Sequence, residues 1–265
     1  MRLILIFILL MFLSANAQNT DEDGDVAIGI EHDKHLGDTI PMELEFTNYT
    51  GDTNKLKDII DKPTVLALVY YRCPGLCSPL MNNLGKVMDE VDLEPGKDFQ
   101  ALSISFDPSE NHELAKDKRV NYINAMQKEI PDHAWRFMTG KSSAIDKLTN
   151  SVGFQYQRAP DSVNWVHSGA VIVLSPEGKI TRYLLGTDYL PFDFKMAITE
   201  ASKGVSSPPI NKVLQYCFSY DPEGGSYVLN VNKIAGTVIF LGAGIFLAVL
   251  LIKGKRRKNK KQGDK

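Results

Sequence analysis

A buried strand that ends in two closely spaced cysteines is the feature that most constrains this chain. Residues 65–71 (VLALVYY) form a continuous apolar run, the pattern of a strand covered on both faces. Residues 73–77 (CPGLC) follow, and apolar residues then recur at helical spacing over residues 79–91. The thiols of Cys73 and Cys77 are therefore predicted at a helix N-terminus, where the helix dipole and free N–H groups stabilise thiolates. Thiolates attack disulfides and bind soft metal ions, so the pattern indicates redox or metal chemistry.

Strand and helix patterns alternate along the rest of the chain. After the helix at 79–91 we predict strands at 99–106, 135–139, 170–174 and 179–185, and helices at 112–130, 142–152 and 191–202. Residues 176–178 (PEG) predict a hairpin between the last two strands, and the earlier strands are predicted to be parallel. A strand at 42–46 and a short helix at 56–60 precede this unit. The predicted fold class is α/β, a thioredoxin-like fold with an N-terminal extension.

The first residues of the chain have the pattern of a secretory signal peptide. Arg2 precedes eleven uncharged apolar residues, 3–13, and the small residues of 14–17 (SANA) suit cleavage after Ala17. Eleven residues are too few to span the hydrocarbon core of a bilayer. We therefore predict a signal peptide rather than an N-terminal anchor.

A second long apolar run lies at residues 234–252, nineteen residues without a charge, and residues 253–265 contain eight lysines and arginines. The length matches a transmembrane helix, and such a basic cluster stays on the cytoplasmic side. A helix of a soluble core would show a polar face instead. These patterns predict a single-pass membrane protein whose domain is exported, to the periplasm or another extracytoplasmic space.

The predicted organisation has six regions. They are a signal peptide 1–17, a flexible N-terminal segment 18–35, a thioredoxin-like domain 36–205, a juxtamembrane linker 206–233, a transmembrane helix 234–252 and a basic cytoplasmic tail 253–265. Residues 3–252 hold 21 Lys and Arg against 31 Asp and Glu, a net charge of −10. This acidic balance argues against nucleic acid as a partner. Three cysteines are too few for a fold built on disulfides.

Four segments carry a family resemblance in their order along the chain. They are residues 36–38 (LGD), 70–77 (YYRCPGLC), 102–108 (LSISFDP) and 166–178 (VHSGAVIVLSPEG). Together they resemble the Sco/SenC family of thioredoxin-fold copper proteins, which assist the assembly of cytochrome c oxidase, and the resemblance covers about residues 36–203. It implies that Cys73, Cys77 and His167 ligate copper. The residue types suit this role, because soft thiolates select Cu(I) and an imidazole helps to hold Cu(II).

The resemblance implies a membrane-anchored copper metallochaperone that delivers Cu(I) or Cu(II) to the copper-site subunit of cytochrome c oxidase. Other copper or thiol-redox proteins are further candidate partners. The alternative is a thiol–disulfide reductase that reduces the cysteines of that subunit, with Cys73 and Cys77 as its catalytic dithiol; the sequence leaves open which thiol attacks. Copper loading and disulfide formation at this pair exclude each other. A peroxidase of the peroxiredoxin kind is disfavoured, because no Thr or Ser stands between the cysteines.

Three features depart from the family pattern, and one is the predicted anchor at the C-terminus, because many members are anchored at the N-terminus. Gly75 and Val166 stand where family members often carry aspartate, which removes two carboxylates from the surroundings of the predicted ligands. Cys217 is an odd cysteine between the domain and the predicted span, and it is interpreted as an inert thiol, with pairing or a ligand role left open.

Other polar residues are given structural roles at this stage. Asp107 is interpreted as a turn or helix-entry residue, although it lies near the predicted site. His32 and His35 are placed in the flexible charged segment, and His112 and His133 at the surface.

Overall fold

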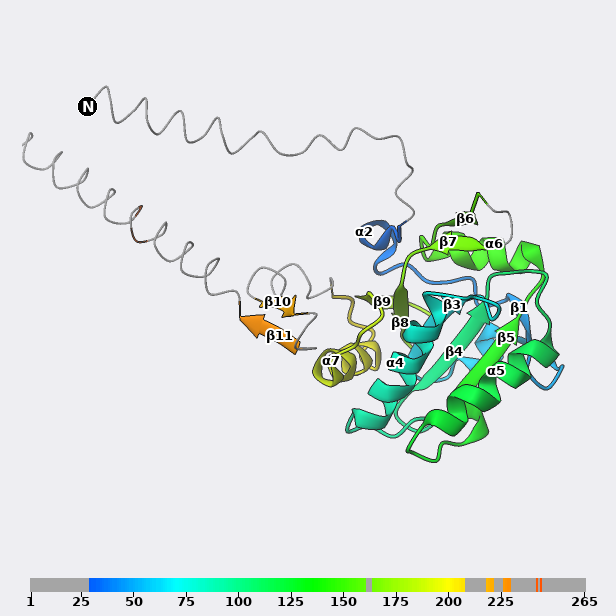
Figure 1. Ribbon diagram of the computed structural model, residues 1–265, viewed down its shortest axis with the longest axis horizontal. Helices are drawn as coiled ribbons and strands as arrows, with labels where there is room; N and C mark the ends of the chain where they lie inside the picture. Colours follow the sequence, from blue (N-terminus) through cyan, green and yellow to red (C-terminus); the bar gives the residue numbers. More distant parts are fainter. Residues whose placement is uncertain are drawn as a thin grey trace, which may run out of the picture.

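The centre of the domain is a seven-stranded mixed sheet (Figure 1). The computed structural model describes residues 29–160, 164–207, 218–221 and 226–229, together with Gly242 and Gly244. The strands of the sheet are β1 Glu45–Asn48, β2 Thr53–Lys55, β3 Thr64–Val69, β4 Gln100–Ser105, β5 Trp135–Thr139, β8 Ala170–Leu174 and β9 Ile180–Leu185. They lie in the order β2-β1-β5-β4-β3-β8-β9.

Helices and two small sheets surround this centre. The helices are α2 His32–His35, α3 Leu56–Ile59, α4 Cys77–Glu90, α5 His112–Ala125, α6 Ser142–Ser151 and α7 Pro191–Ala201, with a 3-10 turn at Asp132–Ala134. The small sheets are the antiparallel pairs β6 Tyr156–Arg158 with β7 Trp165–His167, and β10 Phe218–Asp221 with β11 Ser226–Leu229. In Figure 1, α4 and α5 lie in front of the sheet, and the β6–β7 pair lies beyond one end of it beside α6.

The strand directions bring three segments to one edge of the sheet. β3 runs parallel to β4, and β4 runs parallel to β5, so their carboxyl ends lie on the same side. β8 is antiparallel to β3, with Val171 opposite Ala67, so β8 begins where β3 ends. The segments that follow β3 and β4 therefore meet the segment that precedes β8. These are the segments that carry the predicted cysteines and histidine.

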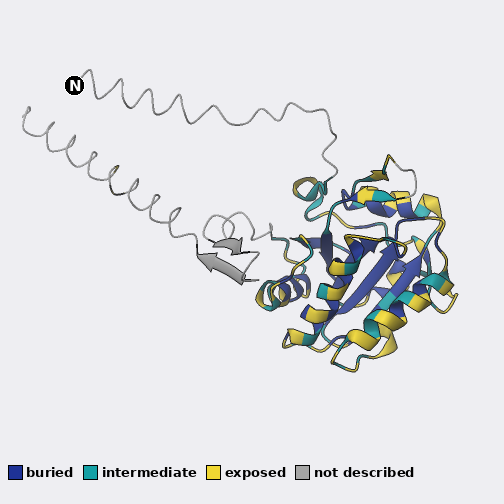
Figure 2. Cartoon of the chain, in the orientation of Figure 1, coloured by how far each residue is buried: buried dark blue, intermediate teal, exposed yellow. Residues whose placement is uncertain are grey.

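The core lies between the sheet and its helices. Every residue of β3 and β4 is buried, as the continuous apolar run of β3 predicts (Figure 2). α4 lies between α5 and α7, and its buried face includes Leu80, Leu84 and Met88. Burying one such side chain stabilises a fold by about 1.5–3 kcal/mol. α4, whose first residue is Cys77, is thereby held firmly against the sheet.

The predicted elements occur in the predicted order, including the parallel strands and the final antiparallel hairpin, but the β6–β7 pair between α6 and β8 was not predicted. The turn of that hairpin contains Gly178 at φ 77, a backbone conformation that favours glycine. The helix predicted at 112–130 is shorter and ends at Ala125. The next residues leave the helix because the backbone N–H groups of Gln127 and Lys128 donate to the carboxylate of Asp89, each at 2.9 Å.

The N-terminal extension differs from the prediction. The predicted strand at 42–46 is found at Glu45–Asn48, and its hairpin partner β2 was not predicted. β2 has the sequence TNK at the edge of the sheet and carries no apolar alternation. The helix predicted at 56–60 is confirmed as α3.

Residues 29–35 also differ from the prediction of a flexible segment. Ile30 forms an isolated bridge with Phe154 and is partly buried against the core. The N–H of Glu31 donates to the carbonyl of Gly153 at 2.8 Å. The charged composition of the segment does not predict these contacts, because backbone hydrogen bonds do not depend on the side chains.

Several predictions fall on residues outside the described ranges. They concern the signal peptide 1–17, the span at 234–252 apart from its two described glycines, the basic tail 253–265 and Cys217. Within the part of the chain that the structure describes, no helix has the length and apolar character needed to cross a bilayer.

Candidate metal centre

The structure brings together the three residues that the sequence singled out. Cys73 lies in the turn after β3, Cys77 is the first residue of α4, and His167 is the last residue of β7. One ligand atom from each lies within 4.8 Å of the other two. Among the described residues, no other group of three or more His, Cys, Asp or Glu side chains meets the same test.

The imidazole of His167 is oriented with one nitrogen toward the cysteines. Its Nδ1 lies 2.9 Å from the carbonyl oxygen of Ser168, and a carbonyl can only accept, so Nδ1 carries the proton. Nε2 then presents its lone pair at 3.4 Å from Sγ of Cys77. The ring is buried against Tyr70 and Phe106, with centroid distances of 5.9 Å and 5.1 Å. This is the tautomer and orientation that a metal-binding histidine requires.

The two thiols have different surroundings. Sγ of Cys73 is half-buried and accepts from the backbone N–H groups of Gly75 and Cys77, both at 3.4 Å. A hydrogen bond from the Cys77 thiol, opposed by burial and helped by the backbone N–H groups of Cys77 and Gly75, lowers the pKa of Cys73 to about 3. The neighbouring Cys73 thiolate, followed by burial, raises the pKa of Cys77. In the metal-free pair, Cys73 is the thiolate and Cys77 holds the proton.

A buried carboxylate that the sequence did not single out supports the cysteine turn. Glu110 accepts from the backbone N–H of Tyr71 at 2.7 Å and of Arg72 at 2.8 Å, and from the hydroxyl of Ser105 at 2.6 Å. Its side chain therefore fixes the backbone immediately before Cys73. Its position, five residues after the end of β4, could have indicated this role. The carboxyl ends of the parallel strands β3 and β4 lie at the same edge of the sheet, so the segments that follow them come together.

Gly75 and Val166, two positions that depart from the family pattern, face solvent. Gly75 is exposed, and a Cβ built on it would contact nothing within 4 Å. Val166 is 42% exposed, because neighbouring residues of a strand point to opposite faces and His167 points inward. Neither position supplies a carboxylate to the centre.

Asp107 has a larger role than the turn residue that was predicted. It is buried, and Oδ1 accepts from Ser109 as a turn residue would. Oδ2 also accepts from the indole N–H of Trp165 at 2.8 Å, two residues before His167. Burial alone would raise the pKa of Asp107, but hydrogen bonds from Trp165 and Ser109 and the charge of Arg158 lower it. The carboxylate therefore links the end of β4 to the strand that carries the histidine.

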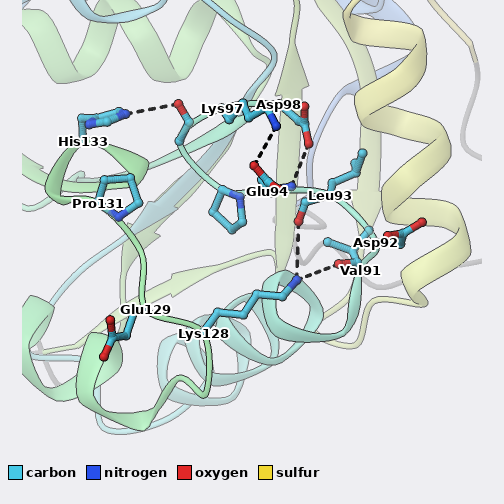
Figure 3. Close-up of a pocket in the computed structure, with 12 residues that line it drawn as sticks. Val91, Asp92, Leu93, Glu94, Lys97, Asp98, Lys128, Glu129, Pro131 and His133 are labelled. Atoms are coloured by element: carbon cyan, nitrogen blue, oxygen red, sulfur yellow. Dashed lines mark hydrogen bonds and ion pairs between the residues drawn. The ribbon is translucent and has the colours of Figure 1, made fainter.

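The remaining histidines make local contacts. Nδ1 atoms of His32 and His35 lie 2.9 Å from Asp33 and 3.5 Å from Asp38, and Nε2 of His112 lies 3.4 Å from Glu113. His133 lies in a separate pocket beyond the C-terminal end of α4 (Figure 3). There its Nε2 lies 3.1 Å from the carbonyl of Gly96, and Lys128 Nζ donates to the carbonyl of Val91 at 2.7 Å. These contacts join groups of the pocket to one another, and its residues form no group that meets the distance test for a metal centre.

Comparison with known proteins places this centre in a family. A family model described as SCO1/SenC matches residues 33–197. The chain belongs to the SCO1/SenC family. The match includes both cysteines of the turn and His167.

Two curated relatives of the family are similar over the same region. The chain is 22% identical to the mitochondrial SCO1 homolog of Homo sapiens over 161 residues, which cover 58% of this chain and 50% of the relative. It is 24% identical to the mitochondrial SCO2 homolog of Bos taurus over 148 residues, or 53% of this chain and 52% of the relative. The match thus spans about half the length of these relatives.

Solved structures support the thioredoxin-like fold of this family. A protein of Aquifex aeolicus VF5 assigned to electron transfer is 28% identical with a TM-score of 0.58, covering 63% of this chain and 95% of its own. The ScoI protein of Arabidopsis thaliana, solved with copper bound, is 18% identical with a TM-score of 0.50 and covers 63% and 98%. At 18% identity, the similarity to the Arabidopsis thaliana protein is evidence for the fold alone.

Proposed function

We propose that this chain is a copper metallochaperone that binds copper through Cys73, Cys77 and His167 and helps to assemble the copper site of cytochrome c oxidase. The observation that carries the proposal is the convergence of two sulfur atoms and a correctly oriented imidazole nitrogen. Membership of the SCO1/SenC family supports it. So does the copper bound to the ScoI protein of Arabidopsis thaliana, a member with the same fold.

The ligand set suits copper as a transferable cargo. Two sulfur ligands favour Cu(I), and the neutral imidazole extends the site to Cu(II). Cys73 is half-buried whereas Cys77 and His167 are buried, so a ligand from a partner can approach the metal from the side of Cys73. Exchange of one ligand at a time would then pass copper to the partner without turnover of an organic substrate.

The proposed partner is the copper-site subunit of cytochrome c oxidase, and the proposed location is the outer face of a membrane. A signal peptide at 1–17 and a transmembrane helix at 234–252 would place the domain there, with the tail 253–265 in the cytoplasm. The length of the apolar run and the basic residues after it support this topology.

The test is a competitive titration of the reduced full chain with Cu(I) and with Cu(II). We expect one ion per chain, loss of Cu(II) binding in His167→Ala, and loss of both ions in Cys73→Ala or Cys77→Ala. His133→Ala is the matched control, because its imidazole lies in the separate pocket. Absence of stoichiometric copper binding by the reduced chain would overturn the proposal.

A thiol–disulfide reductase is the second candidate, and the unequal exposure of the two thiols favours it. The Cys73 thiolate is the accessible nucleophile and the buried Cys77 the resolving thiol. Cys73 would attack a partner disulfide to form a mixed disulfide, and Cys77 would then displace the partner as a thiol. The partner gains two electrons, and the pair becomes a disulfide. A chain that binds no copper but reduces a disulfide of the oxidase subunit stoichiometrically would favour this function.

A further inference from the structure

A hydrogen bond between Trp165 and Asp107 joins the strand that carries His167 to the central sheet. The indole Nε1 donates to Oδ2 of Asp107 at 2.8 Å. Trp165 and His167 are two residues apart in β7, so their side chains lie on the same face of the strand. We propose that Asp107 and Trp165 are positioning residues for His167 and that their hydrogen bond sets how well the centre holds Cu(II) relative to Cu(I). This inference rests on the proposed copper-binding function.

The histidine needs such support because it stands outside the seven-stranded sheet. β7 pairs only with β6 in its sheet, with His167 opposite Tyr156 and Trp165 opposite Arg158. A two-stranded hairpin is marginally stable by itself. The cysteines, in contrast, are fixed by β3 and by the buried face of α4. The distance from the imidazole to the thiols therefore depends on how β6–β7 docks on the domain.

Asp107 is held rigidly in place to receive the indole. Asp107 as a whole residue is 6% exposed, and Oδ1 accepts from the backbone N–H of Ser109 at 2.9 Å and from its hydroxyl at 2.7 Å. Oδ2 faces Trp165 and lies 3.8 Å from Nη2 of Arg158. The guanidinium of Arg158 also stacks on the indole ring, 3.8 Å from its centroid. The indole is thus fixed at its edge by Asp107 and on its face by Arg158.

Phe106, the residue before Asp107, packs near the rings of both His167 and Trp165. The ring of Phe106 lies 5.1 Å from the imidazole of His167 and 6.0 Å from the indole of Trp165. A displacement of Trp165 therefore reaches His167 both along β7 and through the packing on Phe106. Cu(I) is satisfied by two thiolates, whereas Cu(II) depends on the nitrogen ligand. Loosening the anchor should weaken Cu(II) binding selectively.

The experiment compares Trp165→Phe with the wild-type chain. Phenylalanine preserves an aromatic ring but removes the N–H that donates to Asp107. Thr181→Val is the matched control, because it removes one buried hydrogen bond, to the carbonyl of Val173 at 2.9 Å in the β8–β9 hairpin. In competitive titrations we expect Trp165→Phe to lower Cu(II) affinity about tenfold, or about 1.4 kcal/mol, with Cu(I) affinity changed by less than about threefold. Unchanged Cu(II) affinity, or an equal fall for both ions, would overturn the inference.

A measurement without metal separates this inference from the proposed function. Amide hydrogen exchange of the metal-free chain should be faster in β6 and β7 of Trp165→Phe and unchanged there in Thr181→Val. If the wild type binds no copper, the proposed function fails, and the exchange rates alone decide whether the anchor positions His167. Exchange that is equal in all three chains would reject the anchor even if the wild type binds copper.

Discussion

Nε2 of His167 lies 3.4 Å from Sγ of Cys77, although 90 residues separate them in the chain. The contact exists because β8 is antiparallel to β3 and begins at the edge where β3 ends. The cysteines come from the segment after β3, and the histidine comes from the strand just before β8. The parallel arrangement of β3 and β4 adds Asp107 and Glu110 at the same edge. Glu110 supports the cysteine turn, and Asp107 supports the strand that carries His167, so the two parts of the centre can be tested separately.

The pH dependence of thiol alkylation tests the assignment of the thiolate. Because the pKa of Cys73 is lowered to about 3, its alkylation rate should stay nearly constant between pH 5 and pH 8. Below its pKa, an ordinary thiol reacts about tenfold faster for each unit by which the pH is raised. The measurement is mass-spectrometric peptide mapping in a Cys217→Ser background, so that only the pair is followed.

The control for this prediction removes the thiol hydrogen bond to Cys73. Cys77→Ala should raise the pKa of Cys73 and restore a rate that increases with pH. The free energy of unfolding also depends on pH through this group, because the pKa of Cys73 is lower in the folded chain than its ordinary value of 9.0. Its contribution to the free energy of unfolding is present above pH 9.0 and is lost as the pH falls toward about 3. A Cys73 that alkylates like free cysteine would contradict the assignment.

Glu110→Ala should destabilise the fold, because it leaves the N–H groups of Tyr71 and Arg72 and the hydroxyl of Ser105 without their acceptor. The Tyr71 N–H and the Ser105 hydroxyl are the two fully buried donors, and removing the acceptor costs about 1–3 kcal/mol for each, so we expect a loss of about 2–6 kcal/mol in the free energy of unfolding. Urea denaturation of the full chain measures it. Glu110→Gln retains one acceptor oxygen and should lose less. Equal stability of all three chains would show that the carboxylate does not support the turn.

The sequence predicted the order of elements and the cysteine turn because both depend on local patterns. The apolar run of β3 and the helical spacing of α4 are consequences of burial, which every residue of β3 experiences. The cysteine turn follows from the junction of these two elements. His167 could be placed only through the family resemblance, since no local pattern links residues so far apart.

The remaining parts depend on tertiary contacts that have no periodic signal. β2 and β6 are three residues long, with the sequences TNK and YQR, and neither shows an apolar alternation. Glu110 has no local signal, and Asp107 was expected near the site only as a turn or helix-entry residue; the parallel pairing of β3 and β4 brings both to the same edge. The docking of residues 29–35 combines the packing of Ile30 on the core with backbone hydrogen bonds, which any sequence can form.

Arg182→Leu should strongly destabilise the domain without affecting its centre directly. The guanidinium is 2% exposed and pairs with Asp193 at 2.7 Å and Glu200 at 2.8 Å, joining β9 to α7. Removing it leaves two carboxylates unpaired in a partly buried place, and breaking such a pair costs about 3–5 kcal/mol. Urea denaturation measures the loss, and Lys195→Leu is the control because its pair with Asp92 is exposed. Equal effects of the two substitutions would contradict the role of the buried pair.

Gly75→Asp tests whether a carboxylate at this position raises the copper affinity of the centre. The residue is exposed and a Cβ there contacts nothing, so stability should change by less than about 0.5 kcal/mol. A carboxylate two residues from each cysteine adds negative charge beside a bound cation, and it should raise copper affinity by about threefold to tenfold, most for the doubly charged Cu(II). Gly75→Asn has nearly the same shape without the charge and serves as the control. If competitive titrations give Gly75→Asp and Gly75→Asn the same affinity for both ions, charge at this position has no part in holding the metal.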